Sequence, residues 1–363
     1  MIKAVLWLGM LTTCFAANAG VVIENVTIVD VINGQLNPAQ NVLISADKMV
    51  AIQSNTVPGK HQRIDGSSQY LLPGLWDMHT HLANKPATRR LRLFIANGVT
   101  GVREMFSDCN PCNPYQLNLE QMNGLRRDIN THKRLGPRLL ALSAPIVDLQ
   151  GKTAINNFVK QAKKRGADFI KTYTNLPRQS YLYLVEAAKA QGLPVAGHVP
   201  NEVPIGEALS LGHQSVEHAR TLPLYCVDSP TKAIKRSWHN SVNALTQYNE
   251  KHCQVLLKQM ADSNTYYVPT HLTRKMDAFA HDPNFRNDPR LQYIDKLTNV
   301  GWQRDADNYA RDLAGRKHYS AFYQHGLKIT GMASRAGVNI MLGTDANDSY
   351  VIPGFSVHDE LQQ

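Results

Sequence analysis

The fold of this chain is decided by the stretch Leu71–Leu82, LLPGLWDMHTHL. Asp77, His79 and His81 stand at alternate positions in this otherwise apolar run. In an extended strand, residues two apart share a face, so the three polar side chains would project together. Two imidazoles side by side on a buried strand form half of a metal site. A His-x-His pair alone is weak evidence, so the interpretation depends on residues later in the chain.

Length and composition describe an ordinary globular protein of 363 residues, 43% apolar and 19% charged, which suggests one large domain and a smaller one. Residues 1–19 are predicted to be a signal peptide. Lys3 precedes an apolar segment, and Ala17-Asn18-Ala19 offers small residues for cleavage. No later apolar run is long enough to span a membrane. We therefore expect an exported protein, periplasmic or secreted, with no membrane span.

The net charge is +10, but the basic residues are scattered in short groups. None of these groups carries the interleaved aromatic residues of a nucleic-acid platform. The pattern favours solvated helix faces and no nucleic-acid partner.

Four cysteines remain after cleavage of the signal peptide: Cys109, Cys112, Cys226 and Cys253. In an oxidising compartment they could form two disulfides in any of three pairings, of which Cys109–Cys112 with Cys226–Cys253 is the simplest. A Cys-x-x-Cys is also typical of redox and zinc sites. The loop at Cys109 does not open a helix, so we expect a structural bridge there.

Residues 20–72 have the pattern of a small β-sandwich module. Strands are expected over Val21–Asp30, Asn41–Ser45 and Met49–Gln53, with turns at Asn33-Gly34 and Asp47-Lys48. A module of this size is too small to be stable alone and should pack on something larger.

Residues 73–363 alternate between strand and helix patterns. After the first strand, which ends at His81, seven more are expected: 98–105, 138–144, 167–173, 194–198, 214–219, 265–270 and 338–345. Eight strands separated by helices predict an α/β fold, a (β/α)8 TIM-like barrel. An open doubly wound sheet is the alternative, but it lacks a Gly-x-Gly-x-x-Gly loop. The long connections Arg220–Asn264 and His271–Gly337 should add helices at the mouth of the barrel.

Six polar side chains stand at the ends of the expected strands: His79, His81, Lys171, His198, His218 and Asp345. The carboxyl ends of parallel strands meet at one rim of a barrel, so these side chains should converge. A buried lysine has a lowered pKa, and its neutral amine can react with carbon dioxide to give a carbamate that bridges two cations. An ordinary ion-paired lysine is the alternative.

This order of residues, with the phrases at 73–81 (PGLWDMHTH) and 343–346 (GTDA), resembles the amidohydrolase superfamily. The resemblance runs from Val21 to the last residue and points to the imidazolonepropionase-like and exported Xaa-Pro dipeptidase-like branch. It implies a binuclear centre with one cation on His79, His81 and Asp345. The second would lie on His198 and His218, with carboxylated Lys171 and a hydroxide as bridges. Nitrogen and oxygen ligands suit zinc, with manganese, iron or cobalt as alternatives.

The resemblance further implies hydrolysis of an amide (C–N) bond in a small substrate, such as a dipeptide or an acyl-amino acid. Asp345 would act as general base and then as general acid. Tyr173, His271 and Arg103 are candidates for substrate contact, although Arg103 could instead pair with Glu104. Asp77 lies on the same face of the strand and could hydrogen-bond a ligand imidazole.

Members of the superfamily continue beyond the position that corresponds to Gln363, with a helix and then strands that complete the sandwich. We therefore expect the last helix of the barrel to be missing and the small sheet to lack partners. A truncated, non-catalytic remnant that binds metal or ligand is the alternative function. The sequence is compatible with a homo-oligomer.

Overall fold

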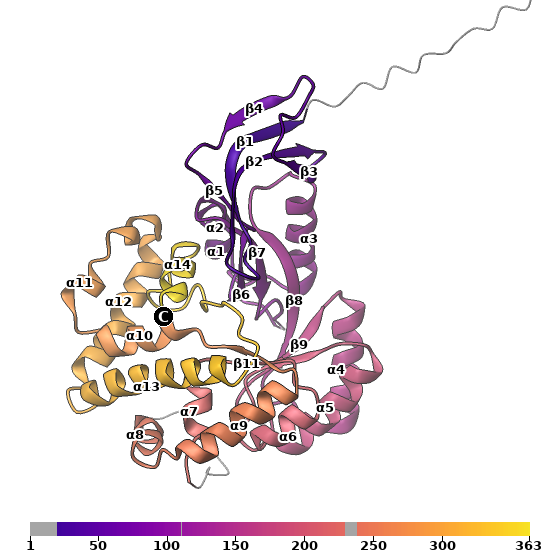
Figure 1. Cartoon of the computed structure of the whole chain (residues 1–363). Helices are drawn as coiled ribbons and strands as arrows, with labels where there is room; N and C mark the ends of the chain where they lie inside the picture. Colours follow the sequence, from indigo (N-terminus) through magenta and orange to yellow (C-terminus); the bar gives the residue numbers. More distant parts are fainter. Residues whose placement is uncertain (1–19, 110, 229–237) are drawn as a thin grey trace, which may run out of the picture. The chain divides into compact units, whose positions relative to one another are not determined.

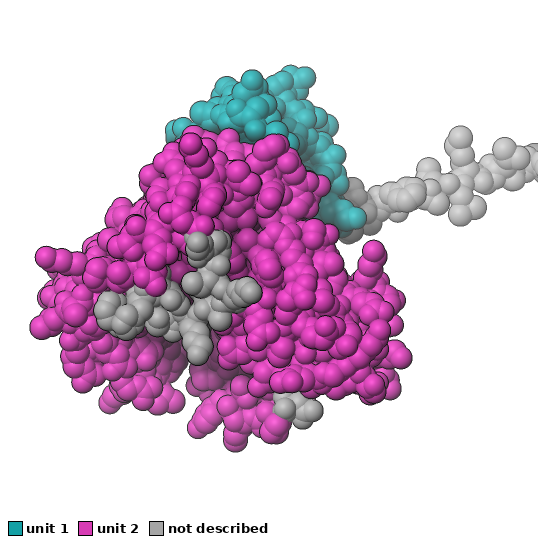
Figure 2. Space-filling view, turned by 90° about the horizontal axis from the view of Figure 1, so that it is seen from below, with its two compact units in different colours: residues 1–73 teal, residues 74–363 magenta. Residues whose placement is uncertain are grey.

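The structure of the chain is a computed structural model that describes residues 20–109, 111–228 and 238–363. The predicted signal peptide lies outside the described residues. Two compact units make up the chain, residues 1–73 and 74–363, and Figure 2 colours them separately.

The first unit contains one five-stranded sheet in the order β3-β2-β1-β4, with β5 also pairing with β1. Its strands are β1 (Val21–Val29), β2 (Leu36–Ser45), β3 (Lys48–Gln53), β4 (Gln62–Asp65) and β5 (Tyr70–Leu71). The three predicted strands are confirmed. The short strands β4 and β5 were not predicted; the residues of β4, QRID, are all exposed and carry no apolar alternation.

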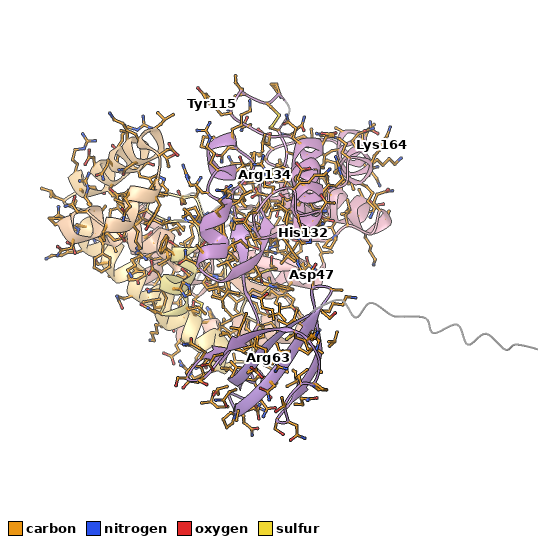
Figure 3. All side chains as sticks on the ribbon, turned by 90° about the horizontal axis from the view of Figure 1, so that it is seen from above. Asp47, Arg63, Tyr115, His132, Arg134 and Lys164 are labelled. Atoms are coloured by element: carbon orange, nitrogen blue, oxygen red, sulfur yellow. A yellow bond between two sulfur atoms is a disulfide. The ribbon has the colours of Figure 1, made fainter. Side chains whose placement is uncertain are left out.

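This sheet is a single layer of the expected sandwich. Val22, Val26 and Val42 are buried along it. Apolar side chains elsewhere on the strands are open to solvent: Leu36, Met49, Val50, Ile52, Ile64 and Tyr70. Arg63 of β4, labelled in Figure 3, pairs with Glu24 of β1 at 2.5 Å, so a surface ion pair adds to the strand pairing.

The second unit is built on a parallel sheet whose seven strands pair in chain order. These strands are β6 (Leu75–Thr80), β7 (Val99–Glu104), β8 (Arg138–Ile146), β9 (Phe169–Thr172), β10 (Val195–Gly197), β11 (Ser215–Glu217) and β12 (Tyr266–Val268). Each corresponds to a strand expected from the sequence.

The eighth expected strand is an irregular segment that still joins the two edges of this sheet. On one side, the Met341 amide donates a hydrogen bond to the Tyr267 carbonyl of β12 (2.9 Å). On the other side, the Met78 amide of β6 donates to the Leu342 carbonyl (2.9 Å). The segment thus closes the barrel, which confirms a TIM-like fold.

Helices surround the barrel strands and fill the long connections (Figure 1). They are α1 (Lys85–Thr88), α2 (Leu91–Ala96), α3 (Leu119–Asn130), α4 (Lys152–Lys164), α5 (Arg178–Ala190), α6 (Ile205–Ser210), α7 (Thr221–Tyr225), α8 (Trp238–Thr246), α9 (Glu250–Asp262), α10 (His271–Phe279), α11 (Pro283–Arg286), the 3₁₀ helix η1 (Pro289–Tyr293), α12 (Lys296–Arg311), α13 (Arg316–Arg335) and α14 (Phe355–Leu361). No helix in the described ranges has the length and apolar character needed to cross a membrane. Both long connections contain helices, as predicted.

Two disulfides are present, Cys109–Cys112 and Cys226–Cys253. The first closes a short turn in the loop after β7, and the second ties the end of α7 to α9. The simplest of the three pairings is therefore confirmed.

Helix α14 is tied to the start of α10 by one buried carboxyl group. Glu360 accepts hydrogen bonds from the backbone amides of His271 (2.7 Å) and Leu272 (3.0 Å). Thr270, at the N-cap of α10, makes no side-chain capping bond, so Glu360 satisfies amides that the helix itself leaves open. Burial raises the pKa of Glu360 to about 8.

This raised pKa predicts a pH-dependent contribution to stability. Between the ordinary carboxyl pKa of about 4.3 and a folded pKa of about 8, the folded state holds a proton that the unfolded state has lost. The contribution of Glu360 is therefore complete at low pH and is lost as pH rises through 8. We expect Glu360→Gln to gain stability relative to the wild type between pH 5.5 and 8.5, measured by urea unfolding of metal-free protein. A difference that is the same at both pH values would contradict this assignment.

Candidate metal centre

Three side chains from opposite ends of the barrel unit converge at its rim. One donor atom from each of His79, His81 and Asp345 lies within 4.8 Å of the other two. The Nε2 atom of His81 is 2.9 Å from Asp345 Oδ1, and that of His79 is 3.4 Å from the same oxygen. His79 is fully buried, whereas the His81 side chain is one-third exposed and lines a cavity.

A second pair of histidines lies beside this group. The Nε2 atoms of His198 and His218 are 2.8 Å apart. His218 Nδ1 lies 2.9 Å from the Thr270 hydroxyl and 3.4 Å from Asp345 Oδ2. Asp345 therefore connects the two groups, with one carboxylate oxygen toward each.

Lys171 completes the set of expected ligands. It is 1% exposed and lines the same cavity as His81, His198 and Asp345. Burial lowers the pKa of Lys171 to about 8, although the nearby carboxylates oppose this shift. Gly197 leaves room for the lysine, because a Cβ there would lie 2.5 Å from Lys171 Cδ.

Two buried carboxylates, Asp77 and Glu217, lie behind the predicted ligands. A contact with a ligand imidazole was predicted for Asp77 and not for Glu217. Asp77 does not bond a ligand imidazole: it accepts hydrogen bonds from the Thr344 amide (3.0 Å) and hydroxyl (2.6 Å). The partner of the His79 ring is Glu217, whose Oε2 lies 2.6 Å from His79 Nδ1. The expectation for Asp77 was wrong, and Glu217 was missed.

Strand alternation explains why Glu217 was missed. His218 directly follows it, and adjacent strand residues normally point to opposite faces. His218 has a φ of +73°, in the left-handed region that non-glycine residues rarely adopt. This turn brings His218 to the rim while Glu217 still points into the barrel. The one sequence signal was a carboxylate directly before His218 in the predicted strand 214–219.

Burial and neighbouring charges shift the pKa values of the predicted ligands. Burial lowers the pKa of His79 to about 4. For His81, burial also acts to lower the pKa, but the hydrogen bond and charge of Asp345 outweigh it and raise the pKa overall. Burial of Asp345 is in turn outweighed by His79 and His81, which hold the pKa of that carboxyl well below its usual range.

The residues fit a bound divalent cation. His79 Nε2 is buried and has no hydrogen-bond partner among the described residues. It lies near the Asp345 carboxylate and the partly exposed His81 imidazole, and a cation would bind all three groups. Imidazole nitrogen with carboxylate oxygen, and no thiolate, is a donor set that suits zinc.

A cavity of about 560 Å³ opens above these groups. Its walls include Tyr173, Arg220 and residues from α10, α12 and the segment after Asp345: Arg274, Met276, Asp277, Asp305, Asn308, Tyr309, Asn347, Asp348 and Ser349. The helices expected at the mouth of the barrel therefore do line it.

The other two candidates for substrate contact do not line this cavity. Arg103 is buried and pairs with Glu217 at 2.9 Å rather than with Glu104. His271 is 2% exposed, and its Nε2 atom lies 2.9 Å from the Thr330 hydroxyl. Tyr173 remains the candidate that the cavity supports.

No family model matches the chain, and no curated protein matches it. Among solved structures, the chain is similar to bottromycin amidohydrolase, with a TM-score of 0.73 and 21% identity over 94% of this chain and 72% of that one. It is also similar to a Xaa-Pro dipeptidase with methionine bound in its active site (TM-score 0.62, 18% identity, 95% and 83% covered). Molinate hydrolase is a third similar structure (TM-score 0.59, 13% identity, 91% and 73% covered).

The chain has the amidohydrolase fold. In this fold, two close approaches hold the predicted ligands in place. Gly343 passes so near β6 that a Cβ would lie 3.0 Å from His79 Cβ, and Gly197 gives Lys171 its space.

Gly197 provides a test of how tightly the amidohydrolase barrel surrounds Lys171. Gly197→Ala would add a Cβ against Lys171 Cδ at a φ of +124°. We expect a loss of about 3 kcal/mol or more of unfolding free energy, combining backbone strain with overpacking. Gly192→Ala is the matched control, because its φ is +61° and its Cβ would meet no described atom within 4 Å. It should cost about 1 kcal/mol. Equal losses in chemical denaturation would show that Lys171 is not tightly enclosed.

Proposed function

We propose that this protein is a metal-dependent hydrolase that cleaves a C–N bond in a small substrate. The observation that carries the proposal is the convergence of His79, His81 and Asp345, with a buried His79 nitrogen left for a ligand. The amidohydrolase fold supports it, since bottromycin amidohydrolase and a Xaa-Pro dipeptidase share the architecture.

In this proposal, His79, His81 and Asp345 would hold one divalent cation, and His198 and His218 would hold a second. Lys171, once carboxylated, would be a ligand common to both, because a buried amine with a pKa near 8 has a substantial neutral fraction that can react with carbon dioxide. Zinc is the expected metal.

The cations would supply an activated water and polarise the scissile carbonyl when bound. Asp345 accepts the proton of the attacking water through the carboxylate that faces both histidine groups, and then delivers it to the leaving nitrogen. Its depressed pKa favours the carboxylate form, which the first of these steps requires. The Tyr173 ring packs edge-on against the His198 ring, 5.0 Å between centroids, and forms part of the wall that would contact the substrate.

The cavity favours a substrate that carries both signs of charge, such as a dipeptide. Arg220 contributes positive charge to its walls and Asp348 contributes negative charge, while Arg274 and Asp277 pair with each other. A zwitterion could place its carboxylate and its ammonium group against opposite charges. An acyl-amino acid, which lacks the ammonium group, is the next candidate.

We also propose that the protein is exported. Residues 1–19 have the pattern of a signal peptide, and the two disulfides suit an oxidising compartment.

The metal requirement is tested by zinc analysis and by hydrolysis of a panel of Xaa-Pro and other dipeptides. We expect about two equivalents of zinc in residues 20–363 and turnover that a chelator abolishes. Lys171→Ala should lose at least one equivalent of zinc and reduce kcat/KM by 100-fold or more, because it removes the bridge. Lys189→Ala, an exposed residue at the end of α5, is the control and should change neither.

Folded, zinc-loaded protein without turnover on any substrate would instead support the non-catalytic remnant. Folded protein without zinc would contradict both.

The charge of the cavity predicts a preference for a free amino terminus. We expect kcat/KM for a dipeptide to exceed that for its N-acetyl form by about 10-fold or more, the effect of one charged hydrogen bond. Asp348→Asn should lower this ratio of kcat/KM values toward one, because the Asp348 side chain is exposed and lines the cavity. Asp262→Asn, on the exposed face of α9, should leave the ratio unchanged. An unchanged ratio in Asp348→Asn would exclude contact with the amino group.

A further inference from the structure

Below the rim, a buried ion pair reaches the back of one predicted ligand. Glu217 lies between Arg103 Nη2, 2.9 Å from its Oε1, and His79 Nδ1, 2.6 Å from its Oε2. The side chains of His79, Glu217 and Arg103 are 0%, 0% and 5% exposed. This chain of contacts joins β7, β11 and β6 inside the barrel.

The contact with Glu217 fixes which nitrogen of His79 carries a proton. An ionised carboxylate can only accept hydrogen bonds, so the hydrogen of the neutral ring must lie on Nδ1. The lone pair is then on Nε2, the atom that lies 3.4 Å from Asp345. His218 differs, because its Nδ1 lies beside the Thr270 hydroxyl, which can donate or accept.

Arg103 keeps this arrangement in place from the other side. Besides Glu217, it donates to the Ser215 hydroxyl (2.8 Å) and to the Met78 carbonyl (2.6 Å), next to His79 in the chain. The Ser215 hydroxyl in turn donates to Glu217 Oε1 at 2.5 Å, the oxygen that Arg103 also contacts. The guanidinium therefore places the opposite charge beside the acceptor carboxylate and also anchors the strand that carries His79.

We propose that Glu217 and Arg103 are positioning residues that present His79 as an Nε2 donor and so set the affinity of the cation held by His79, His81 and Asp345. This inference rests on the proposed metal site. Supporting groups behind a ligand histidine typically change metal affinity by 10- to 100-fold.

The first test is Glu217→Gln, with zinc affinity measured by chelator competition on the full-length protein after signal cleavage. The amide has one oxygen and one NH2 group, so it can accept from His79 or from Arg103 but not from both. We expect zinc at one site to bind about 10- to 100-fold more weakly while the other site changes little. Glu360→Gln is the control, because it makes the same change at a buried carboxyl group that bonds the His271 and Leu272 amides and no predicted ligand; its zinc affinity should stay within about threefold of the wild type.

The second test separates positioning from a merely structural role. Adding Arg103→Met to Glu217→Gln removes the competing donor, so the amide oxygen becomes available to His79. We expect the double variant to recover at least half of the lost affinity on a logarithmic scale, even though its unfolding free energy stays below that of the wild type. Affinity that falls further, in step with stability, would overturn the proposal.

If Glu217→Gln alone does not fold, the comparison is made between two double variants that both carry Arg103→Met. Glu217→Gln retains an acceptor for His79 and Glu217→Leu does not, so the Leu form should bind zinc at least 10-fold more weakly. Equal affinities would overturn the inference. Wild-type protein that binds no zinc would instead defeat the proposed function, so the two failures are distinguishable.

Discussion

Closure of the barrel between its first strand and its last segment is the constraint on which the site depends. The Asp345 amide donates to the His79 carbonyl at 2.8 Å, and the His81 amide donates to the Ala346 carbonyl at 2.5 Å. These backbone bonds bring together residues from opposite ends of the unit. Any loss of register here would move Asp345 away from both histidines, so the same hydrogen bonds maintain the fold and assemble the predicted metal site.

Buried charge is a second feature of the site, and each charged group is offset by a neighbour. Asp345 lies between two histidine groups, and Glu217 between His79 and Arg103. Breaking one partner of such a pair leaves an uncompensated buried charge, which costs more than the pair itself contributes. These paired charges therefore favour one arrangement of the side chains at the rim, and that arrangement is already in place before a ligand binds.

Much of this organisation could be predicted from the sequence because strand patterns and strand ends are local features. Seven barrel strands, the helices of the long connections and both disulfides follow from apolar periodicity and cysteine spacing. The partners of buried polar groups could not be predicted in this way. The sequence suggested a substrate or the neighbouring Glu104 as the partner of Arg103, whereas the barrel brings Arg103 to Glu217 across the interior. His218 and Asp345 adopt left-handed φ values of +73° and +68°, which could not be predicted from their residue types.

The edge strands of the barrel are hydrogen-bonded and those of the small sheet are open, and this difference affects how the protein could self-associate. In the barrel unit, the segment around Met341 and Leu342 forms backbone hydrogen bonds with both edge strands of the sheet, β6 and β12. Few backbone groups at these edges are therefore left to pair with another molecule. The small sheet is open, with β3 at its border, and Met49, Val50 and Ile52 on that strand are more than half exposed. Apolar, open borders of this kind are templates for intermolecular strand addition. Amyloid-like or edge-to-edge aggregation of this protein should therefore start in the small sheet while the barrel is still native.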